Sequence, residues 1–533
     1  MGYELLSKGN FRLVQDERWS LHPLMQRSVK QVLQQRGLAM AAHQKAIAYF
    51  LTNLKPSATT IADCTEELEI FHHRCELQQY DLAKQIMDRC VDFLDRSGYY
   101  RELVQVYKRL THTWEEQCPT QPEAQRNLGW AWTRLGNTYQ SLGQFRAAIS
   151  AHQQAQQWFE RIEDSWGKAA CFGNLGNAYL SLGQYERAIE FHQQHFTIAH
   201  EIGDRQGEAN SLGSLGNAYR SLGQYERAIE FLQQTLEISR EIGDRQGEGQ
   251  SLGNLGLAYD SLGQYEQAIE FHQQHLVISR EIGDRQGEGQ SLGNLGLAYR
   301  SLGQYEQAIE FHQQHLVISR EIGDRQGEAT SLGNLGLAYD SLGQYEQAIE
   351  FYQQSLAIAR EIGDRRGKGQ SLGNLGLAYR SLGQYEQAIE FHQQYLDISR
   401  EIGDRRGQAR SLFNKALALA RYNPRRFEAL ETFKQARTIY AELGLDHEVE
   451  SCDKAIHAFS QIVATEDLFA PKVAPAIGTP PPPDPQWEKS MPQPVTSRPA
   501  SEGSSRTPKW VQIVWLFGGG IAIVVIAHIL LNQ

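Results

Sequence analysis

Residues 283–322 read GDRQGEGQSLGNLGLAYRSLGQYEQAIEFHQQHLVISREI, and this 40-residue unit recurs with small changes from Ala131 to Arg410. Segments 251–290 and 291–330 differ at only three positions. A fixed period of about 20 to 50 residues is typical of solenoids and other repeat arrays. The sequence therefore predicts one long array of similar units over this part of the chain.

Each unit contains two helical stretches separated by a short turn. In the quoted unit, we expect the first helix to begin after Asp284, which suits an N-cap, with Glu288 in its opening turns. Gly303 then breaks the chain, and Gly323 suits a left-handed cap at the end of the second helix. Because neither helix can bury its apolar face alone, neighbouring pairs must stack.

Several residues of the unit lie where tetratricopeptide repeats carry their signature. These are Leu295, Gly296, Tyr299, Gly303, Tyr305 and Ala308. With the 40-residue length and the Leu-Gly-Asn tripeptides, they make the array similar to the longer-helix subclass of that family. This subclass includes the Leu-Gly-Asn polarity adaptors and, more distantly, the kinesin light chains. The resemblance implies an all-α, right-handed solenoid of helix hairpins.

The resemblance and the shifts in composition divide the chain into six regions. They are a winged-helix-like remnant (1–38), a helical linker or degenerate repeats (39–130), seven tetratricopeptide repeats (131–410), a degenerate repeat with a capping helix (411–465), a proline- and serine-rich linker (466–508) and a transmembrane tail anchor (509–533). In the degenerate repeat, Phe413 and Lys415 replace the Gly and Leu of the signature. We expect a helix containing Cys452 to cap the stack.

The N-terminal stretch FRLVQDERWSLHPLMQRSVKQVL predicts a strand, a turn, a second strand and then a helix from Pro23. Its Leu-His-Pro-Leu string at 21–24 resembles the winged-helix end of bacterial signal-transduction ATPases of the NB-ARC/STAND type. In that class, a nucleotide-binding domain comes before this module and a repeat array follows it. The chain has no GxxxxGK[ST] phosphate-binding motif, so we expect an array without its own nucleotide-binding domain.

The C-terminal stretch from Val511 to Leu531 is almost entirely apolar and is long enough for a helix to cross a bilayer. Arg506 and Lys509 precede it, which by the positive-inside rule places the repeats in the cytoplasm. The sequence therefore predicts a single-pass tail anchor, with a buried core helix as the alternative. A small-xxx-small pair, Gly518 and Ala522, offers a contact for a homo-oligomer through this helix.

Composition narrows the classes of function. The net charge is −11, and no basic stripe with interleaved aromatic residues is present, which argues against a nucleic-acid partner. The six cysteines are scattered without a CxxC pair, as expected for reduced thiols rather than a zinc site or a disulfide framework. We predict no cofactor.

The string FHQQH recurs at 191–195, 271–275 and 311–315, and imidazole is a common metal ligand. Across the seven units, the first histidine position holds His152, His192, Leu232, His272, His312, Tyr352 and His392. The second holds Ala155, His195, Thr235, His275, His315, Ser355 and Tyr395. Positions that accept Leu or Tyr are packing positions, so we predict no metal site and no catalytic site. A diagonal approach of His275 and His312 is the one arrangement that keeps metal binding open.

The family resemblance implies that the first helix of each pair lines a concave groove where ligands lie. Carried over position by position, the predicted groove residues are Asn174, Asn177, Asn210, Asn217, Gln250, Asn254, Gln290, Asn294, Arg300, Asn334 and Asn374. An amide side chain offers donors and an acceptor to an extended peptide backbone without demanding a particular sequence. The alternative is that these amides only solvate the helix surface.

Two features depart from the family pattern. The second asparagine, kept at Asn177 and Asn217, is leucine at 257, 297, 337 and 377, which makes the central floor more apolar. The residue after the Ala-Tyr pair alternates along the array as Arg220, Asp260, Arg300, Asp340 and Arg380. This alternation fits either a charge ladder between neighbouring helices or the duplication of an 80-residue double unit.

Together these patterns predict a non-enzymatic, membrane-anchored scaffold that binds protein or peptide segments in the groove and faces the cytoplasm. The alternative is the sensor and assembly module of a split signal-transduction ATPase whose nucleotide-binding domain lies on another chain. A metal-dependent enzyme is a distant third hypothesis.

Overall fold

The computed structural model describes residues 11–14, 18–21, 39–55, 60–117, 119–422 and 426–469. The helix predicted from Pro23, the proline-rich linker beyond Phe469 and the transmembrane helix predicted at 509–533 lie outside these residues. Within them, every helix is too short or too polar to cross a membrane.

The chain divides into two compact units, with the boundary between Leu222 and Gly223. In chain order, the first unit holds β1 (Phe11–Val14), β2 (Arg18–Leu21), α3 (Ala39–Thr52), the short 3-10 helix η1 (Ile61–Cys64), α4 (Thr65–Glu76), α5 (Tyr80–Met87), α6 (Val91–Arg96), α7 (Tyr100–Glu115), α8 (Pro122–Ser141), α9 (Phe145–Arg161), α10 (Ser165–Ser181), α11 (Tyr185–Glu201) and α12 (Arg205–Ser221).

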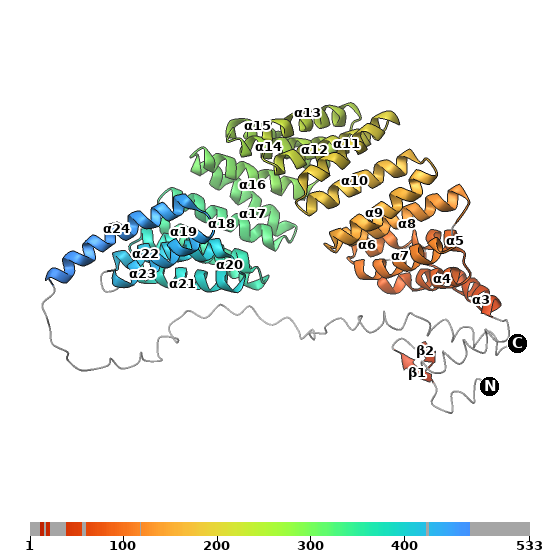
Figure 1. Ribbon diagram of the computed structural model, residues 1–533, viewed down its shortest axis with the longest axis horizontal. Coiled ribbons are helices and arrows are strands. Elements are labelled where there is room, and N and C mark those ends of the chain that lie inside the picture. The colour runs from red at the N-terminus through yellow and green to blue at the C-terminus, as the bar shows by residue number, and fades with distance from the viewer. Residues whose placement is uncertain are drawn as a thin grey trace. The chain divides into compact units, whose positions relative to one another are not determined.

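The second unit consists of helices. These are α13 (Tyr225–Glu241), α14 (Arg245–Ser261), α15 (Tyr265–Ile282), α16 (Arg285–Ser301), α17 (Tyr305–Glu321), α18 (Arg325–Ser341), α19 (Tyr345–Glu361), α20 (Arg365–Ser381), α21 (Tyr385–Glu401), α22 (Arg405–Arg421), α23 (Arg426–Glu442) and α24 (Asp446–Phe469). Consecutive helices from α14 to α23 stack as hairpins (Figure 1). The described part of the chain is therefore an all-α solenoid, apart from the two short strands near its beginning.

The start and end of each hairpin follow from the residues predicted to set them. The Asp284 carboxylate accepts a hydrogen bond from the Gly287 backbone N–H at 2.9 Å, as an N-cap does. The same cap recurs at Asp164, Asp204, Asp244, Asp324, Asp364 and Asp404. Gly303 and Gly323 have φ angles of 75° and 71°, a left-handed conformation that glycine adopts at no steric cost. The predicted hairpin is confirmed.

The signature tyrosine and the phenylalanine of each FHQQ-type string join the two helices of a hairpin. Tyr299 on α16 stacks on Phe311 on α17, with ring centroids 5.2 Å apart and an interplanar angle of 7°. The same stack recurs in the second unit at Tyr259–Phe271, Tyr339–Phe351 and Tyr379–Phe391. Beside the stack at Tyr299, Leu295 and Ile318 are buried in one cluster, so each hairpin contributes the same seam to the core.

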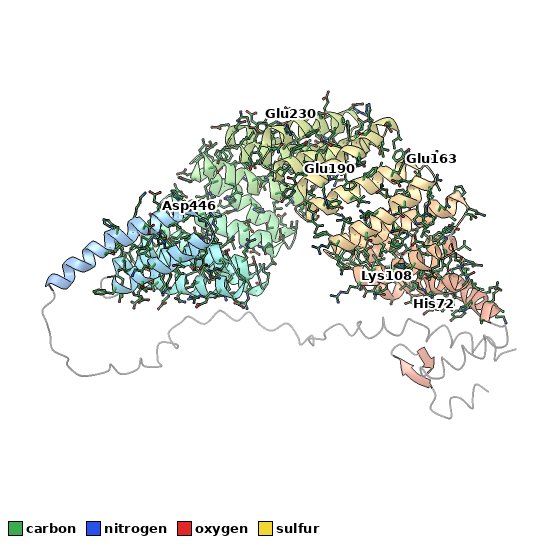
Figure 2. The ribbon with its side chains drawn as sticks, in the orientation of Figure 1. His72, Lys108, Glu163, Glu190, Glu230 and Asp446 are labelled. Carbon is green, nitrogen blue, oxygen red and sulfur yellow. The ribbon has the colours of Figure 1, made fainter. Side chains whose placement is uncertain are left out.

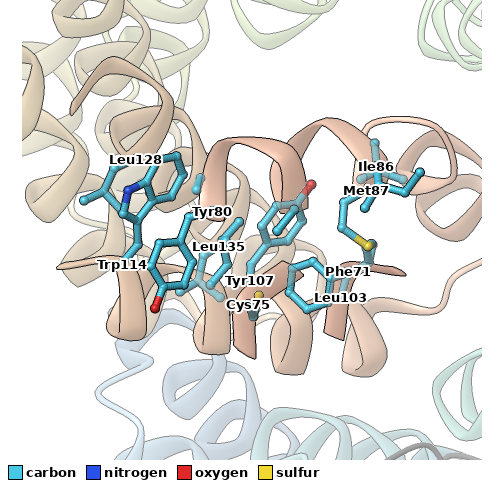
Figure 3. Close-up of a cluster of buried hydrophobic side chains, with 14 of the residues drawn as sticks. Phe71, Cys75, Tyr80, Ile86, Met87, Leu103, Tyr107, Trp114, Leu128 and Leu135 are labelled. Atoms are coloured by element: carbon cyan, nitrogen blue, oxygen red, sulfur yellow. The ribbon is translucent and has the colours of Figure 1, made fainter. Parts of the chain in front are cut away.

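The helices before the repeats share a hydrophobic core with the first repeats (Figure 3). Tyr80 on α5 stacks on Trp114 on α7, with ring centroids 5.7 Å apart. Leu128 and Leu135 on α8 belong to the same buried cluster as Tyr107 on α7. The helical linker and the beginning of the array therefore form one packed body within the first unit.

The ends of the described chain also match the predicted elements. The strands β1 and β2 pair in antiparallel fashion, with Phe11 opposite Leu21, which confirms the two predicted strands; the predicted turn between them lies outside the described residues. At the other end, α24 packs on α23, and Cys452 is fully buried in their cluster. This capping helix continues to Phe469, four residues beyond the predicted boundary at 465.

Candidate functional site

The first histidine position lies directly beneath the glycine of the Leu-Gly signature. A Cβ atom added to Gly256 would lie 2.4 Å from the ring of His272, closer than any real contact, so only glycine fits beside the ring. The same pairing occurs at Gly136–His152, Gly176–His192, Gly296–His312, Gly336–Tyr352 and Gly376–His392. All these rings are buried. The packing interpretation of the first histidine position is confirmed.

Burial keeps most of these imidazoles uncharged. Loss of hydration lowers the pKa of His152 to about 4, and the same effect, with a smaller contribution from His195, lowers that of His192 to about 4. The pKa of His312 falls to about 3 through burial first, then through His315 and Arg300. For His192 and His312, neither ring nitrogen has a hydrogen-bond partner. These rings therefore fill volume.

The alternating Arg and Asp residues face the histidine position of their own hairpin. Asp260 Oδ2 lies 3.0 Å from His272 Nε2, a contact between α14 and α15. Arg300, in the same place on α16, is one of the charges that depress the pKa of His312. Between hairpins, the charge of Arg380 opposes the effect of burial on Asp340, although burial dominates and raises the pKa of that carboxyl group.

Within the described part of the second unit, no ion pair closer than 4.0 Å joins the alternating residues. The main effect of the alternation is therefore that successive buried rings have an acidic or a basic neighbour in turn. It is not a chain of direct salt bridges.

Four of the predicted groove residues come together around one cavity. Gln250 and Asn254 on α14 and Gln290 and Asn294 on α16 line a space of about 410 Å³. Its remaining lining is Gln246, Gly253, Leu257, His275, Asp284, Gln286 and Gly287. The neighbouring first helices therefore present amides and one apolar side chain to the same opening, and the imidazole of His275 on α15 and the carboxylate of Asp284 before α16 complete its lining.

The other predicted groove residues also lie on first helices, and all of them except Arg300 are on helices other than α14 and α16. Asn174 and Asn177 lie on α10, Asn210 and Asn217 on α12, Arg300 on α16, Asn334 on α18 and Asn374 on α20. The structure does not bring these residues into the cavity between α14 and α16. Arg300 is half-buried beside His312, so its position differs from that of the amides around the cavity.

His275 belongs to the cavity, which the sequence did not reveal. Its ring lies under Gly253, where an added Cβ would be 2.9 Å from Nδ1. The Ser291 hydroxyl donates to the Gly287 carbonyl at 2.9 Å and lies 2.8 Å from His275 Nδ1, so its oxygen is placed to accept the imidazole N–H. Burial lowers the pKa of His275, with His272 adding to the effect and Asp284 opposing it.

This arrangement has the opposite polarity to an activated serine nucleophile, in which the imidazole accepts the hydroxyl proton. The missing side chain of Gly253 is the only signal in the sequence that could have placed His275 at the groove. Among the described residues, no group of three or more histidine, cysteine or acidic side chains is placed to hold a metal ion.

A second feature that the sequence did not reveal is a ladder of ion pairs across the hairpins. Buried Glu248 accepts from Arg240 at 2.8 Å and also pairs with Arg245, which reaches Glu281 on the next second helix. Glu288 and Glu328 repeat this arrangement with their own arginines. Glu288, expected near the N-cap, therefore links two arginines from different helices. We name Glu248, Glu288 and Glu328 the ladder glutamates.

The model of the tetratricopeptide repeat family matches the chain at 127–201, 207–281, 287–361, 341–401 and 367–442. These matches cover more than half of the chain, so the protein belongs to the tetratricopeptide repeat family. The resemblance inferred from the Leu-Gly, Tyr and Ala positions is confirmed. No curated protein sequence matches the chain.

Solved structures that are similar to this chain include a STAND protein with a tetratricopeptide repeat sensor from Pyrococcus horikoshii, with 19% identity over 75% of this chain and a TM-score of 0.49. This chain spans 58% of the length of that protein. The nearly identical repeats of a putative kinesin light chain from Podosopora anserina share 25% identity over 36% of this chain and 95% of their own, with a TM-score of 0.33. Aspartyl phosphate phosphatase F from Bacillus subtilis shares 17% identity over 65% of this chain and 96% of its own, with a TM-score of 0.45.

Proposed function

We propose that this protein is a scaffold that binds extended segments of partner proteins along the first helices of its hairpins. The observation that carries the proposal is the cavity between α14 and α16, where four amide side chains converge over an exposed opening. Repeat solenoids use such extended surfaces for binding. The amides of Asn254 and Asn294 can both donate to and accept from a peptide backbone.

The lining of the cavity sets the chemistry of the ligand. Leu257 gives an apolar contact for a ligand side chain, while Gln250 and Gln290 provide polar contacts beside it. The amide and leucine positions recur on α18 as Asn334 and Leu337 and on α20 as Asn374 and Leu377. Linked, similar sites favour a repetitive or multivalent partner, because each further contact is made at a high effective concentration.

The groove proposal is tested by capture of partners from a cell lysate with the full chain and with an N254A/N294A variant. Gln267 and Gln307, exposed amides on second helices, supply the matched control Q267A/Q307A. We expect partners to be retained by the control and lost from the groove variant, as measured by quantitative mass spectrometry. Identical captured proteins for both variants would contradict the proposal.

We further propose that residues 509–533 anchor the scaffold in a membrane, with the repeats on the cytoplasmic side. The support is the length and apolar character of this segment and the basic residues that precede it. Replacing Ile521 and Val525 with arginine would place two charges within the span, each costing about 2.5 to 3.5 kcal/mol. Release of the full-length variant from the membrane fraction is the expected result. Equal membrane retention would contradict anchoring by this segment.

A second candidate function is a sensor module for a separate signal-transduction ATPase. The β1–β2 hairpin and the helices that share a core with the first repeat favour it. This function requires a chain with a phosphate-binding loop to co-purify with the protein, and ATP hydrolysis by that chain to change when the repeats are added. If no such chain were found among the captured partners, the sensor function would be contradicted and only the scaffold function would remain.

A further inference from the structure

The repeats of the second unit differ sharply in charge although they are nearly identical in sequence. Residues 240–290 carry four basic and nine acidic side chains, whereas residues 360–410 carry nine basic and seven acidic ones. Both windows have the same length, so the local net charge changes from clearly negative to positive. The reversal comes from a few substitutions at defined positions of the unit.

Three of these substitutions fall on the groove positions. Gln246 and Gln286, which line the central cavity, are replaced by Arg366 on α20 and Arg406 on α22 at the same place in the unit. Gln290, also in the cavity lining, is replaced by Arg410 on α22. All three arginines are exposed. The first helices at this end therefore carry guanidinium groups where the central ones carry neutral amides.

Their surroundings leave these cations available to a ligand. The carboxylates of Asp364 and Asp404 are engaged as N-caps, with the backbone N–H groups of Gly367 and Gly407 at 2.9 and 2.8 Å. Arg406 reaches Glu448 on α24 only at 3.4 Å, and the Arg406 side chain remains 72% exposed. Among the described residues, no ion pair within 4.0 Å involves Arg366 or Arg410.

Arg410 is held over an aromatic ring on the groove side. Its Nη2 donates to the Tyr395 hydroxyl at 2.5 Å, and its guanidinium carbon lies 5.4 Å from the centre of that ring. Tyr395 occupies the place that His275 has in the central cavity. The ring thus orients Arg410 without neutralising it, which preserves its charge for a ligand.

Two of the three arginines lie where a positive charge disfavours the helix. Arg366 and Arg406 lie in the first turn of α20 and α22, where the helix dipole disfavours a positive charge. In the same turn of α20, Lys368 takes the place of a ladder glutamate, so the two ion pairs that Glu328 makes with Arg320 and Arg325 have no counterpart there. A feature that weakens the local fold is better explained by binding.

We propose that the first helices α20 and α22 form a subsite for an acidic peptide segment, whose carboxylates pair with Arg366, Arg406 and Arg410. The inference rests on the proposed peptide-binding function and adds the charge of the ligand. Guanidinium groups bind carboxylates through paired, charge-assisted hydrogen bonds. Neutral or apolar residues of the ligand contact the amides between α14 and α16, and its acidic residues contact the arginines of α20 and α22.

The test uses the full-length protein and a matched variant, R366Q/R406Q/R410Q. Glutamine occupies all three equivalent positions in the central repeats, so the variant is expected to fold, as circular dichroism would verify. The probes are two fluorescein-labelled twelve-residue peptides, one with a run of four glutamates and one with glutamines in their place. Binding is measured by fluorescence anisotropy at low and at physiological salt.

We expect the acidic probe to bind at least about tenfold more weakly to the variant, and the neutral probe to bind both proteins equally. Equal affinity of the two proteins for the acidic probe would overturn the inference, as would failure of the unmodified protein to bind this probe up to about 1 mM. Tighter binding of a single-stranded RNA that the arginine variant loses would also overturn it, in favour of a nucleic-acid site.

The same measurements separate this inference from the groove proposal. If the neutral probe binds and N254A/N294A weakens it while the arginine variant changes nothing, the peptide groove stands and the acidic subsite falls. If the arginine variant alone weakens the acidic probe and N254A/N294A changes neither probe, the subsite stands and the central amides are not the groove.

Discussion

The two faces of the first helices in the second unit vary in different ways from repeat to repeat. On the face that packs against the second helix, the rings of His272, His312 and Tyr352 each cover a glycine, so the polarity of the covering ring changes while the glycine is kept. On the groove face, Gln286 becomes Arg406, so charge changes in an exposed place. We therefore expect variation on the packed face to affect local stability, and we propose that variation on the groove face affects which ligand is bound.

The largest effect on the packed face should come from acid. The pKa of His312 is about 3, and that of His392 is also about 3, mainly because burial disfavours the charged ring. In the unfolded chain the usual value is about 6.5, so below it the unfolded state binds protons that the folded state excludes. Stability is full above about pH 6.5 and is lost as the pH falls towards 3, by about 2 kcal/mol per ring at pH 5.

Urea unfolding followed by circular dichroism at pH 7 and pH 5 measures this loss. An H312L/H392L variant should lose clearly less stability between the two pH values than the unmodified protein. H447L, which changes an exposed histidine on α24, is the matched control and should keep the original pH dependence. The same loss in both variants would show that these buried rings do not control acid sensitivity.

A substitution under the ring tests the packed face directly. In G296A the added Cβ would lie 2.4 Å from the His312 ring, which is buried on all sides and has no room to move. We expect a loss of about 1 to 3 kcal/mol in the free energy of unfolding, as is usual for overpacking. The control is G293A, three residues earlier on the same helix α16, where the added Cβ meets His315 at 3.2 Å.

Because His315 is only half-buried and can shift, G293A should be close to neutral or slightly stabilising through better helix propensity. Urea midpoints of the two variants give the comparison. Equal midpoints would mean that the glycine of the Leu-Gly signature is not required by the ring beneath it.

The same His-to-Leu substitution in two neighbouring hairpins should change stability in opposite directions. H272L removes the partner of the half-buried Asp260 carboxylate, whose other oxygen already has none, so a loss of about 1 to 3 kcal/mol is expected at pH 7. H312L removes a ring whose two nitrogens are both unpaired, and should stabilise by about 1 kcal/mol. The chain already carries Leu232 at this position. Thermal unfolding measures both changes in stability. If both variants were stabilised, or both destabilised, the pairing of Asp260 with His272 would be contradicted.

Much of the fold could be predicted because its determinants are local. Asp284, Gly303 and Gly323 mark the ends of each helix within one unit, and comparison of the seven units identified the histidine position as a packing position. The ladder glutamates could not be predicted, because their arginines come from two helices and only the folded hairpins bring them together. Helix packing also explains why Asp260 meets His272.

The site could be predicted only in part, for a similar reason. The family pattern placed Gln250, Asn254, Gln290 and Asn294 on the first helices, and the structure gathers these four around one cavity. His275 was assigned to packing, with a diagonal approach to His312 left open for metal binding. Its access to the cavity was missed because this access depends on the absence of a side chain at Gly253. Whether any of these residues contacts a ligand remains a prediction.

The smallest expected effect concerns the ion-pair ladder, in which Lys368 on α20 occupies the position of a ladder glutamate. K368E would give Arg360 and Arg365 the partner that Glu328 provides to Arg320 and Arg325. Because those arginines are largely exposed, we expect a gain of only about 0.5 to 1 kcal/mol in thermal unfolding. E328K, the reverse change one hairpin earlier, should destabilise.

Lys368 takes the place of Glu248, which is not part of the cavity lining, whereas Arg366, Arg406 and Arg410 take the places of residues that are. K368E should therefore raise the unfolding midpoint and leave the affinity for the acidic peptide nearly unchanged, while R366Q/R406Q/R410Q lowers that affinity. If K368E weakened the acidic peptide as much as the triple variant does, the effect would follow total charge rather than position. The distinction between the ladder position and the groove positions would then fail, because a diffuse positive field needs no particular arginine.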